Sequence, residues 1–225
     1  MSARLQFVLS FLIVVFLAVG SASAQGRLPP GVGEKINAIM KGGGEASGYP
    51  VGYTKSNYLP EWCDYTWDGT SKVRPVIEDY FRYFGEGFMA MHHYCRGLYR
   101  AHEARENPRD RSRNLELYRR AIIEYGFVLK NTDDQYRLRS EVLVQTGLAH
   151  LSRGESMDAV RAFQTAIDLR PTYIPAYVAL GNYFRRAGQA SEARRVLESG
   201  IAAVPQSDLL RTKLRELGSQ DTSSR

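Results

Sequence analysis

The sequence lacks the motifs that mark the common enzyme classes. It contains no Cys-x-x-Cys-His segment for covalent haem, no His-Glu-x-x-His metal motif, no Gly-x-Ser-x-Gly nucleophile turn and no glycine-rich phosphate loop. Its carboxylates at Glu155, Asp158, Asp168 and Glu192 fall on the expected solvent faces of helices, where charged side chains are typical. These absences predict a protein that is not an enzyme and that uses no cofactor.

Long apolar runs are also scarce. The run Phe7–Val19, preceded by Arg4, is shorter than the roughly 20 apolar residues that a membrane-spanning helix needs. It is followed by Ala22-Ser23-Ala24, a small-x-small cleavage pattern. We expect residues 1–24 to be a secretory signal, with an uncleaved anchor as the alternative. The protein would then be periplasmic or secreted, and would meet the membrane only transiently, through this segment.

Cysteine is rare, and Cys63 and Cys95 are the two that the chain contains. In an oxidising compartment an even pair predicts one disulfide, which would fasten the segment around Cys63 to the first long helix. The run Met91-His92-His93-Tyr94-Cys95 offers an alternative, because two thiolates and one or two imidazoles suit a zinc or copper site. Since the disulfide uses both thiolates, the two hypotheses exclude each other, and we favour the disulfide.

Charge is only mildly unbalanced. The chain has 30 Lys and Arg against 24 Asp and Glu, a formal net charge of +6 at pH 7. Basic and acidic residues alternate along the expected helices instead of forming a block, which is typical of solvated helix faces. We therefore expect no nucleic-acid partner.

The sequence contains one 34-residue pattern twice, between Ser140 and Pro205. The pairs that lie 34 positions apart are Gly147/Gly181, Gly154/Gly188, Ala159/Ala193, Phe163/Leu197, Leu169/Ala203 and Pro171/Pro205. A period of this length, with small residues at fixed positions, predicts stacked helix–turn–helix units.

This pattern resembles the tetratricopeptide repeat (TPR), which has a bulky residue, Leu-Gly, an aromatic residue, then Gly, Ala, an aromatic residue, Ala and Pro. The second copy has Tyr177, Leu180-Gly181, Phe184, Gly188, Ala193, Leu197, Gly200 and Pro205, and the first has Leu143, Thr146-Gly147, His150, Gly154, Ala159, Phe163, Ala166 and Pro171. The resemblance implies an all-α fold: a short right-handed solenoid of helical hairpins with an irregular N-terminal cap and a C-terminal capping helix.

The resemblance also implies a binding face. In TPR proteins the first helix of each repeat lines a concave groove that contacts peptide, and some cytosolic members hold a peptide's terminal carboxylate with Asn and basic residues. By resemblance, Asn182 and Arg186 occupy groove positions with Arg185 adjacent, and Leu148 and Ser152 are the equivalents in the first copy. Only the second copy offers the Asn and Arg pair. Exposed, solvated side chains are the alternative interpretation of these residues.

The chain is expected to be organised as a leader at 25–57, an aromatic segment at 58–74, a divergent hairpin at 75–132, two repeats at 133–205, a capping helix at 206–217 and a polar tail at 218–225. In the divergent hairpin the first helix ends at about Arg105 and the second spans about 110–130, with Tyr125 at a repeat position and Arg109 where the repeat glycine should stand. Asp133-Asp134 is expected to cap the next helix, from about 135 to 153. The later helices are expected at about 156–169, 173–187 and 190–204.

The segment 58–74 is dense in aromatic residues, with Tyr58, Trp62, Tyr65 and Trp67 within ten positions. These rings either cap the open end of the helical stack or form an exposed platform for a glycan or an extended peptide. Trp62 and Tyr65 are therefore candidate partner-binding residues.

The sequence favours a non-catalytic adaptor or assembly factor of the bacterial envelope that docks a segment of another envelope protein in the concave groove. Two alternatives stay open. One is a periplasmic metal-binding or redox accessory protein that uses Cys63, His92, His93 and Cys95. The other is a cell-wall glycan binder that uses the aromatic segment.

Overall fold

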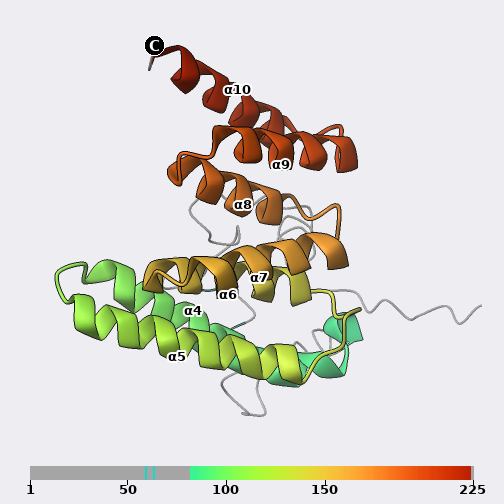
Figure 1. Cartoon of the computed structure of the whole chain (residues 1–225). Coiled ribbons are helices and arrows are strands. Elements are labelled where there is room, and N and C mark those ends of the chain that lie inside the picture. Colours follow the sequence, from blue (N-terminus) through green and yellow to red (C-terminus); the bar gives the residue numbers. More distant parts are fainter. Residues whose placement is uncertain (1–58, 60–62, 64–81, 224–225) are drawn as a thin grey trace, which may run out of the picture.

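The structure, a computed structural model, describes residues 59, 63 and 82–223, with side chains as far as 218 (Figure 1). The leader, most of the aromatic segment and the expected signal lie outside these residues. All regular elements of the described part are helical: η2 (Glu86–Ala90), α4 (Met91–Glu106), α5 (Arg111–Lys130), α6 (Arg139–Arg153), α7 (Ser156–Leu169), α8 (Ile174–Arg186), α9 (Ala190–Ala203) and α10 (Asp208–Ser223).

The helices pack in adjacent pairs, α4 with α5, α6 with α7 and α8 with α9, and α10 lies against the last pair (Figure 1). The first helices of successive pairs also touch, since α4 contacts α6, α6 contacts α8 and α8 contacts α10. The expectation of an all-helical chain built from helical hairpins is thus confirmed for the described residues. None of the helices described is both long and apolar enough to cross a membrane.

Most helix boundaries match the sequence prediction. The helix expected at about 110–130 is α5, which follows Asp110, whose carboxylate accepts a hydrogen bond from the backbone N–H of Arg113 at 3.0 Å. The helices expected at about 156–169, 173–187 and 190–204 are α7, α8 and α9, and the first helix ends at Glu106.

The prediction for the start of α6 was wrong. Asp133 does not cap a helix from 135, because its side chain accepts from the backbone N–H of Gln135 in a local turn. Successive turns then carry the chain to Leu138, and α6 begins at Arg139. The guanidinium of Arg139 donates to the backbone carbonyls of Leu129 and Thr132, both at 2.7 Å, so the segment stays folded back against the end of α5.

The polar tail predicted from 218 is also wrong, because α10 continues to Ser223. The capping helix starts as expected, with the Ser207 hydroxyl accepting from the backbone N–H of Leu210 at 3.3 Å. Leu210 and Leu217 are buried, so this helix packs an apolar side against the rest of the stack. Gly218 lies inside this helix.

The repeat glycines are small because two helices pack closely at each of them. A Cβ atom on Gly147 would lie 2.4 Å from a ring carbon of Phe163, and one on Gly181 would lie 3.1 Å from Leu197. Each contact joins the first helix of a repeat to the second helix of the same repeat. The two contacts are equivalent, because Gly181 and Leu197 lie 34 positions after Gly147 and Phe163. The 34-residue period of the sequence is therefore a period of the packing.

The turns within the two repeats are equivalent as well. Gly154 and Gly188 have positive φ angles of 82° and 73°. In the first turn the N–H of Glu155 reaches the carbonyl of His150, and in the second the N–H of Gln189 reaches that of Phe184, both at 2.9 Å. This pattern of a left-handed glycine with a long backward hydrogen bond is a Schellman motif, which ends α6 and α8.

The first hairpin, α4 with α5, contains the same contact at a different spacing. A Cβ on Gly97 would lie 2.3 Å from the ring of Tyr125, so Gly97 is the repeat glycine, and the sequence prediction of Arg109 for this position was wrong. Gly97 and Tyr125 are 28 positions apart, against 16 for Gly147 and Phe163. The additional residues lengthen both helices on the side of their turn, so that the α4–α5 turn extends beyond the neighbouring hairpin (Figure 1).

Candidate functional site

The face that the sequence predicts for partner binding can be located from the glycine contacts. Gly181 points toward α9, and a helix turns about 100° per residue, so Asn182 and Arg186 lie about 100° and 140° away from that direction. Both residues therefore lie on the side of α8 turned away from α9, one helical turn apart. We call this side of α4, α6 and α8 the inner face. Asn182 is half-buried and Arg186 is exposed.

Two other predicted groove residues are placed differently. Leu148 packs against the core cluster formed by α6, α7 and α8, so it contributes to the core as well as to the inner face. Arg185 follows Gly181 by four residues, which places it within about 40° of the direction of α9 and off the inner face. Trp62 and Tyr65 lie outside the described residues. The structure thus brings Asn182 and Arg186 onto one face and separates Arg185 from them.

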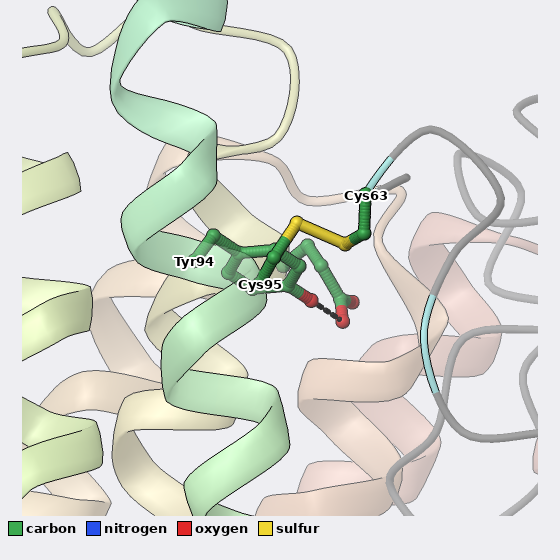
Figure 2. Close-up of a disulfide and its surroundings, with 4 residues drawn as sticks. Cys63, Tyr94 and Cys95 are labelled. Carbon is green, nitrogen blue, oxygen red and sulfur yellow. Dashed lines mark hydrogen bonds between the residues drawn. A yellow bond between two sulfur atoms is a disulfide. The ribbon is translucent and has the colours of Figure 1, made fainter. Parts of the chain in front are cut away.

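The predicted disulfide between Cys63 and Cys95 is confirmed. The sulfur atoms are 2.05 Å apart, the Cα atoms are 5.7 Å apart, and the two residues are 3% and 1% exposed (Figure 2). Cys95 precedes Gly97 by two residues, so it faces away from Tyr125 of α5 and lies on the inner face. The disulfide therefore attaches Cys63 to the inner face of the first hairpin.

The two histidines of the metal hypothesis contact each other and groups other than the disulfide. The His92 and His93 rings lie 4.2 Å apart, with His92 against the backbone carbonyl of Met89 and His93 against Glu124 of α5. Burial lowers the pKa of His92. Both sulfurs are bonded to each other, and no cluster of three or more His, Cys, Asp or Glu side chains fit for a metal occurs among the described residues. The four proposed ligands are not brought together in this oxidised form.

A buried carboxylate, Glu141, is a feature that the sequence prediction missed. Glu141 is 6% exposed and accepts a hydrogen bond from the Tyr94 hydroxyl at 2.7 Å (Figure 2). It also accepts from the Gln145 amide at 3.0 Å and from the Tyr173 hydroxyl. These donors come from α4, from α6 and from the residue before α8, so one carboxylate joins three successive hairpins. One sequence signal could have drawn attention to Glu141: it is a charged residue at the position where the second repeat has Pro175.

A cleft is lined by residues of α7, α8 and α9. Its volume is about 530 Å³, and the residues that line it are Val160, Gln164, Ile167, Tyr177, Leu180, Phe184, Gln189, Glu192, Arg195, Val196 and Ser199. Tyr177, Leu180 and Phe184 of α8 line the cleft together with residues of α7 and α9. The sequence prediction did not include this cleft.

A second cluster that the prediction missed lies on the first hairpin, where Arg96 and Arg100 of α4 approach Glu124 of α5. Arg96 Nη2 is 3.2 Å from Glu124 Oε2, and Arg100 Nε is 3.8 Å from Glu124 Oε1. His93, which also contacts Glu124, stands two residues before Cys95 and therefore points about 160° away from it around α4. Because Cys95 lies on the inner face, the cluster lies outside that face.

Neither models of known protein families nor curated proteins give a match to this sequence.

Proposed function

We propose that this chain is a TPR-like, non-catalytic adaptor or assembly factor of the bacterial envelope, which docks a segment of another protein on its inner face. The observation that carries the proposal is the equivalence of the two repeats in packing. The contact Gly147–Phe163 recurs 34 residues later as Gly181–Leu197, and the turn at Gly154 recurs 34 residues later at Gly188. A short right-handed solenoid of three hairpins, closed by α10, is the architecture that this periodicity supports.

The inner face supplies the chemistry for holding an extended segment. The Asn182 amide offers both a donor and an acceptor, which suits a peptide backbone. The Arg186 guanidinium, one turn further along α8, offers a fork of N–H donors for a carboxylate. Ser152, at the equivalent position of α6, is exposed, and its hydroxyl donates to the carbonyl of Leu148 at 3.0 Å. Asn182, Arg186 and Ser152 define the docking row that we propose.

The compartment follows from two features that agree. The apolar run before Ala24 is typical of an export signal, and the buried Cys63–Cys95 disulfide suits an oxidising compartment such as the periplasm. We therefore infer that the partner is another envelope or secreted protein.

Site-specific crosslinking tests this proposal. A photo-reactive amino acid at position 182 or 186 should yield a discrete crosslinked partner in cells, whereas the same residue at position 161, on the exposed surface of α7, should not. Arg186→Ala should reduce the crosslink at position 182 several-fold, because it removes the guanidinium beside it. Equal crosslinking at all three positions, or no crosslink at 182 and 186, would contradict docking on the inner face.

The two alternative functions make different predictions. A metal-binding or redox accessory protein that uses Cys63, His92, His93 and Cys95 should show two free thiols by intact mass after alkylation, and bound metal in protein purified without a His tag. A glycan binder that uses Tyr58, Trp62, Tyr65 and Trp67 should sediment with cell-wall sacculi. An adaptor that binds through α8 should do neither.

A further inference from the structure

The first hairpin exposes large apolar side chains on a face that no other described helix covers. Of the five large apolar residues that are well exposed in the described part of the chain, four belong to η2, α4 or α5: Met89, Tyr99, Ile123 and Phe127. Ile123 and Phe127 stand two residues before and after the fully buried Tyr125, so each lies about 160° from it around α5. They therefore point away from the core and are 57% and 42% exposed.

A charged cluster lies between these apolar side chains. Glu124 approaches His93 Nδ1 at 2.5 Å, Arg96 Nη2 at 3.2 Å and Arg100 Nε at 3.8 Å. The His93 ring stacks on Phe127, with centroids 3.7 Å apart, so the charged and apolar groups are in direct contact. We call the surface made by Met89, His93, Arg96, Arg100, Ile123, Glu124 and Phe127 the α4–α5 outer face.

The cations of this face exceed the anions. Arg96 and Arg100 share the single carboxylate of Glu124, and the Nε atoms of both arginines are buried without a hydrogen-bond partner. The nearest other acidic residues along these helices are engaged elsewhere, since Glu103 pairs with Arg113 and Glu116 with Arg119 and Arg120. The two guanidinium groups therefore carry one more positive charge than Glu124 neutralises, and a partner carboxylate beside their partly exposed side chains would balance it.

We propose that the α4–α5 outer face is a second docking surface, and that its partner is a protein segment in which an acidic residue stands next to an aromatic or aliphatic one. The partner carboxylate bridges Arg96 and Arg100, and the neighbouring apolar side chain covers Ile123 and Phe127. Apolar area next to an arginine pair is the composition of the energetic centre of protein interfaces. This surface is distinct from the inner face of the proposed function, which is defined by Asn182 and Arg186 on α8.

A protein segment fits this face better than an anionic bilayer. Attraction to anionic lipid amounts to about 1 kcal/mol for each Lys or Arg near the surface, so bilayer binding relies on several extended cations. Here the two arginines are 34% and 29% exposed in their side chains and are held against Glu124. The α4–α5 outer face has one excess positive charge beside a small apolar area. A protein segment with one carboxylate beside one apolar side chain complements both features.

The test is selection of 12-residue peptides from a random displayed library on the purified full chain. We expect enrichment of sequences with Asp or Glu adjacent to Phe, Leu, Ile or Trp. By fluorescence anisotropy, Arg96→Gln combined with Arg100→Gln should weaken binding of a selected peptide at least tenfold, and Ile123→Ser should weaken it several-fold. Arg161→Gln, a matched change at an exposed arginine of α7, and Arg186→Ala on the inner face should leave binding unchanged.

Several outcomes would overturn the proposal. One is the absence of acidic-apolar enrichment, and another is equal binding to the double arginine variant. An equal loss with Arg161→Gln would indicate general attraction to a basic protein. Sedimentation that reveals a dimer which Phe127→Ser dissociates would assign the face to a second copy, and binding to anionic vesicles lost in the same variant would assign it to a membrane. If the double arginine variant does not fold by circular dichroism, Ile123→Ser decides, because that side chain is mostly exposed.

Discussion

Gly97 is the residue at which the packing of the first hairpin is most restricted. Its α-carbon approaches the Tyr125 ring so closely that a Cβ would lie 2.3 Å from it, and Tyr125 is fully buried. Gly97→Ala should therefore lower the free energy of unfolding by about 1–3 kcal/mol, the usual cost of overpacking a core. Urea unfolding followed by circular dichroism at 222 nm measures this difference.

Gly126 is the matched control on the facing helix. A Cβ there would meet no atom within 4 Å, and the residue is exposed in the interior of α5. Gly126→Ala should leave stability unchanged or raise it by about 0.5–1 kcal/mol, because alanine favours the helix. If both substitutions raise stability, the close contact of Gly97 with Tyr125 is not present in solution.

For single residues, the sequence predicts a structural role when the same residue type occurs at the equivalent position of both repeats. It misses residues whose role has no counterpart in the other repeat. Gly147 and Gly181 could be recognised because each is the other's copy. Gly97 could not be aligned, because the longer helices shift it out of the 34-residue period. Glu141 escaped prediction since its three donors come from distant parts of the chain, and no local pattern brings Tyr94 and Tyr173 together.

The turn between α6 and α7 is stabilised by the Glu155 carboxylate as well as by the left-handed Gly154. The Glu155 carboxylate lies 2.7 Å from His150 Nδ1 and 2.8 Å from Arg153 Nε, and Arg153 Nη1 donates to the carbonyl of Leu115 in the preceding hairpin at 2.6 Å. Partial burial opposes ionisation of Glu155, but the hydrogen bonds from His150 and Arg153 hold its pKa below 4.5.

This lowered pKa predicts how stability depends on pH. Because the folded state favours the ionised form of Glu155, its contribution is fully present above about pH 4.5, and is lost as the pH falls through the folded-state pKa. Glu155→Gln should therefore lower the urea midpoint at pH 7 and change it much less at pH 3. Glu198→Gln, at an exposed position of α9, should have little effect at either pH. An equal loss for Glu155→Gln at both pH values would contradict the pairing.

Helix boundaries were predictable where a local signal sets them and wrong where tertiary contacts do. Asp110 and the glycines at 154 and 188 are local signals, and the helices begin and end beside them as expected. The start of α6 depends on the hydrogen bonds of Arg139 to the end of α5, which the sequence of the segment alone does not reveal. The end of α10 was misjudged because the polar sequence after Leu217 continues as helix to Ser223.

For the whole molecule, the disulfide is a cross-link that joins Cys63 to the first hairpin in addition to the peptide chain. Cys63 and Cys95 are 32 positions apart, so the bond should stabilise the fold by about 3–4 kcal/mol in the chain-entropy account. Reduction should lower the thermal midpoint by about 10 °C for a chain of this size. Because both sulfurs are held in the disulfide, alkylation without reductant should label neither cysteine, even after unfolding.

The double substitution Cys63→Ser and Cys95→Ser provides the control for this measurement. The variant should melt near the midpoint of the reduced protein and should not respond to added reductant. Two alkylated thiols in the untreated, freshly purified protein would contradict the disulfide and would revive the metal hypothesis.

The candidate site was predictable only in part. The repeat resemblance pointed to Asn182 and Arg186, and the helix geometry places both on the inner face. It gave no information about Arg96, Arg100 and Glu124, because these residues lie in the hairpin that departs from the repeat. Trp62 and Tyr65 remain predictions.

The unequal length of the hairpins also determines how copies of this protein can assemble. A solenoid whose two ends match can add copies head to tail without limit, because a heterologous contact that does not close on itself produces a filament. Here one end is formed by the long helices α4 and α5, whose contact residues are 28 positions apart, and the other by the single helix α10. Among the described helices the two ends of the stack therefore differ in shape, so we expect a head-to-tail contact between copies to lack the match that an open-ended filament requires.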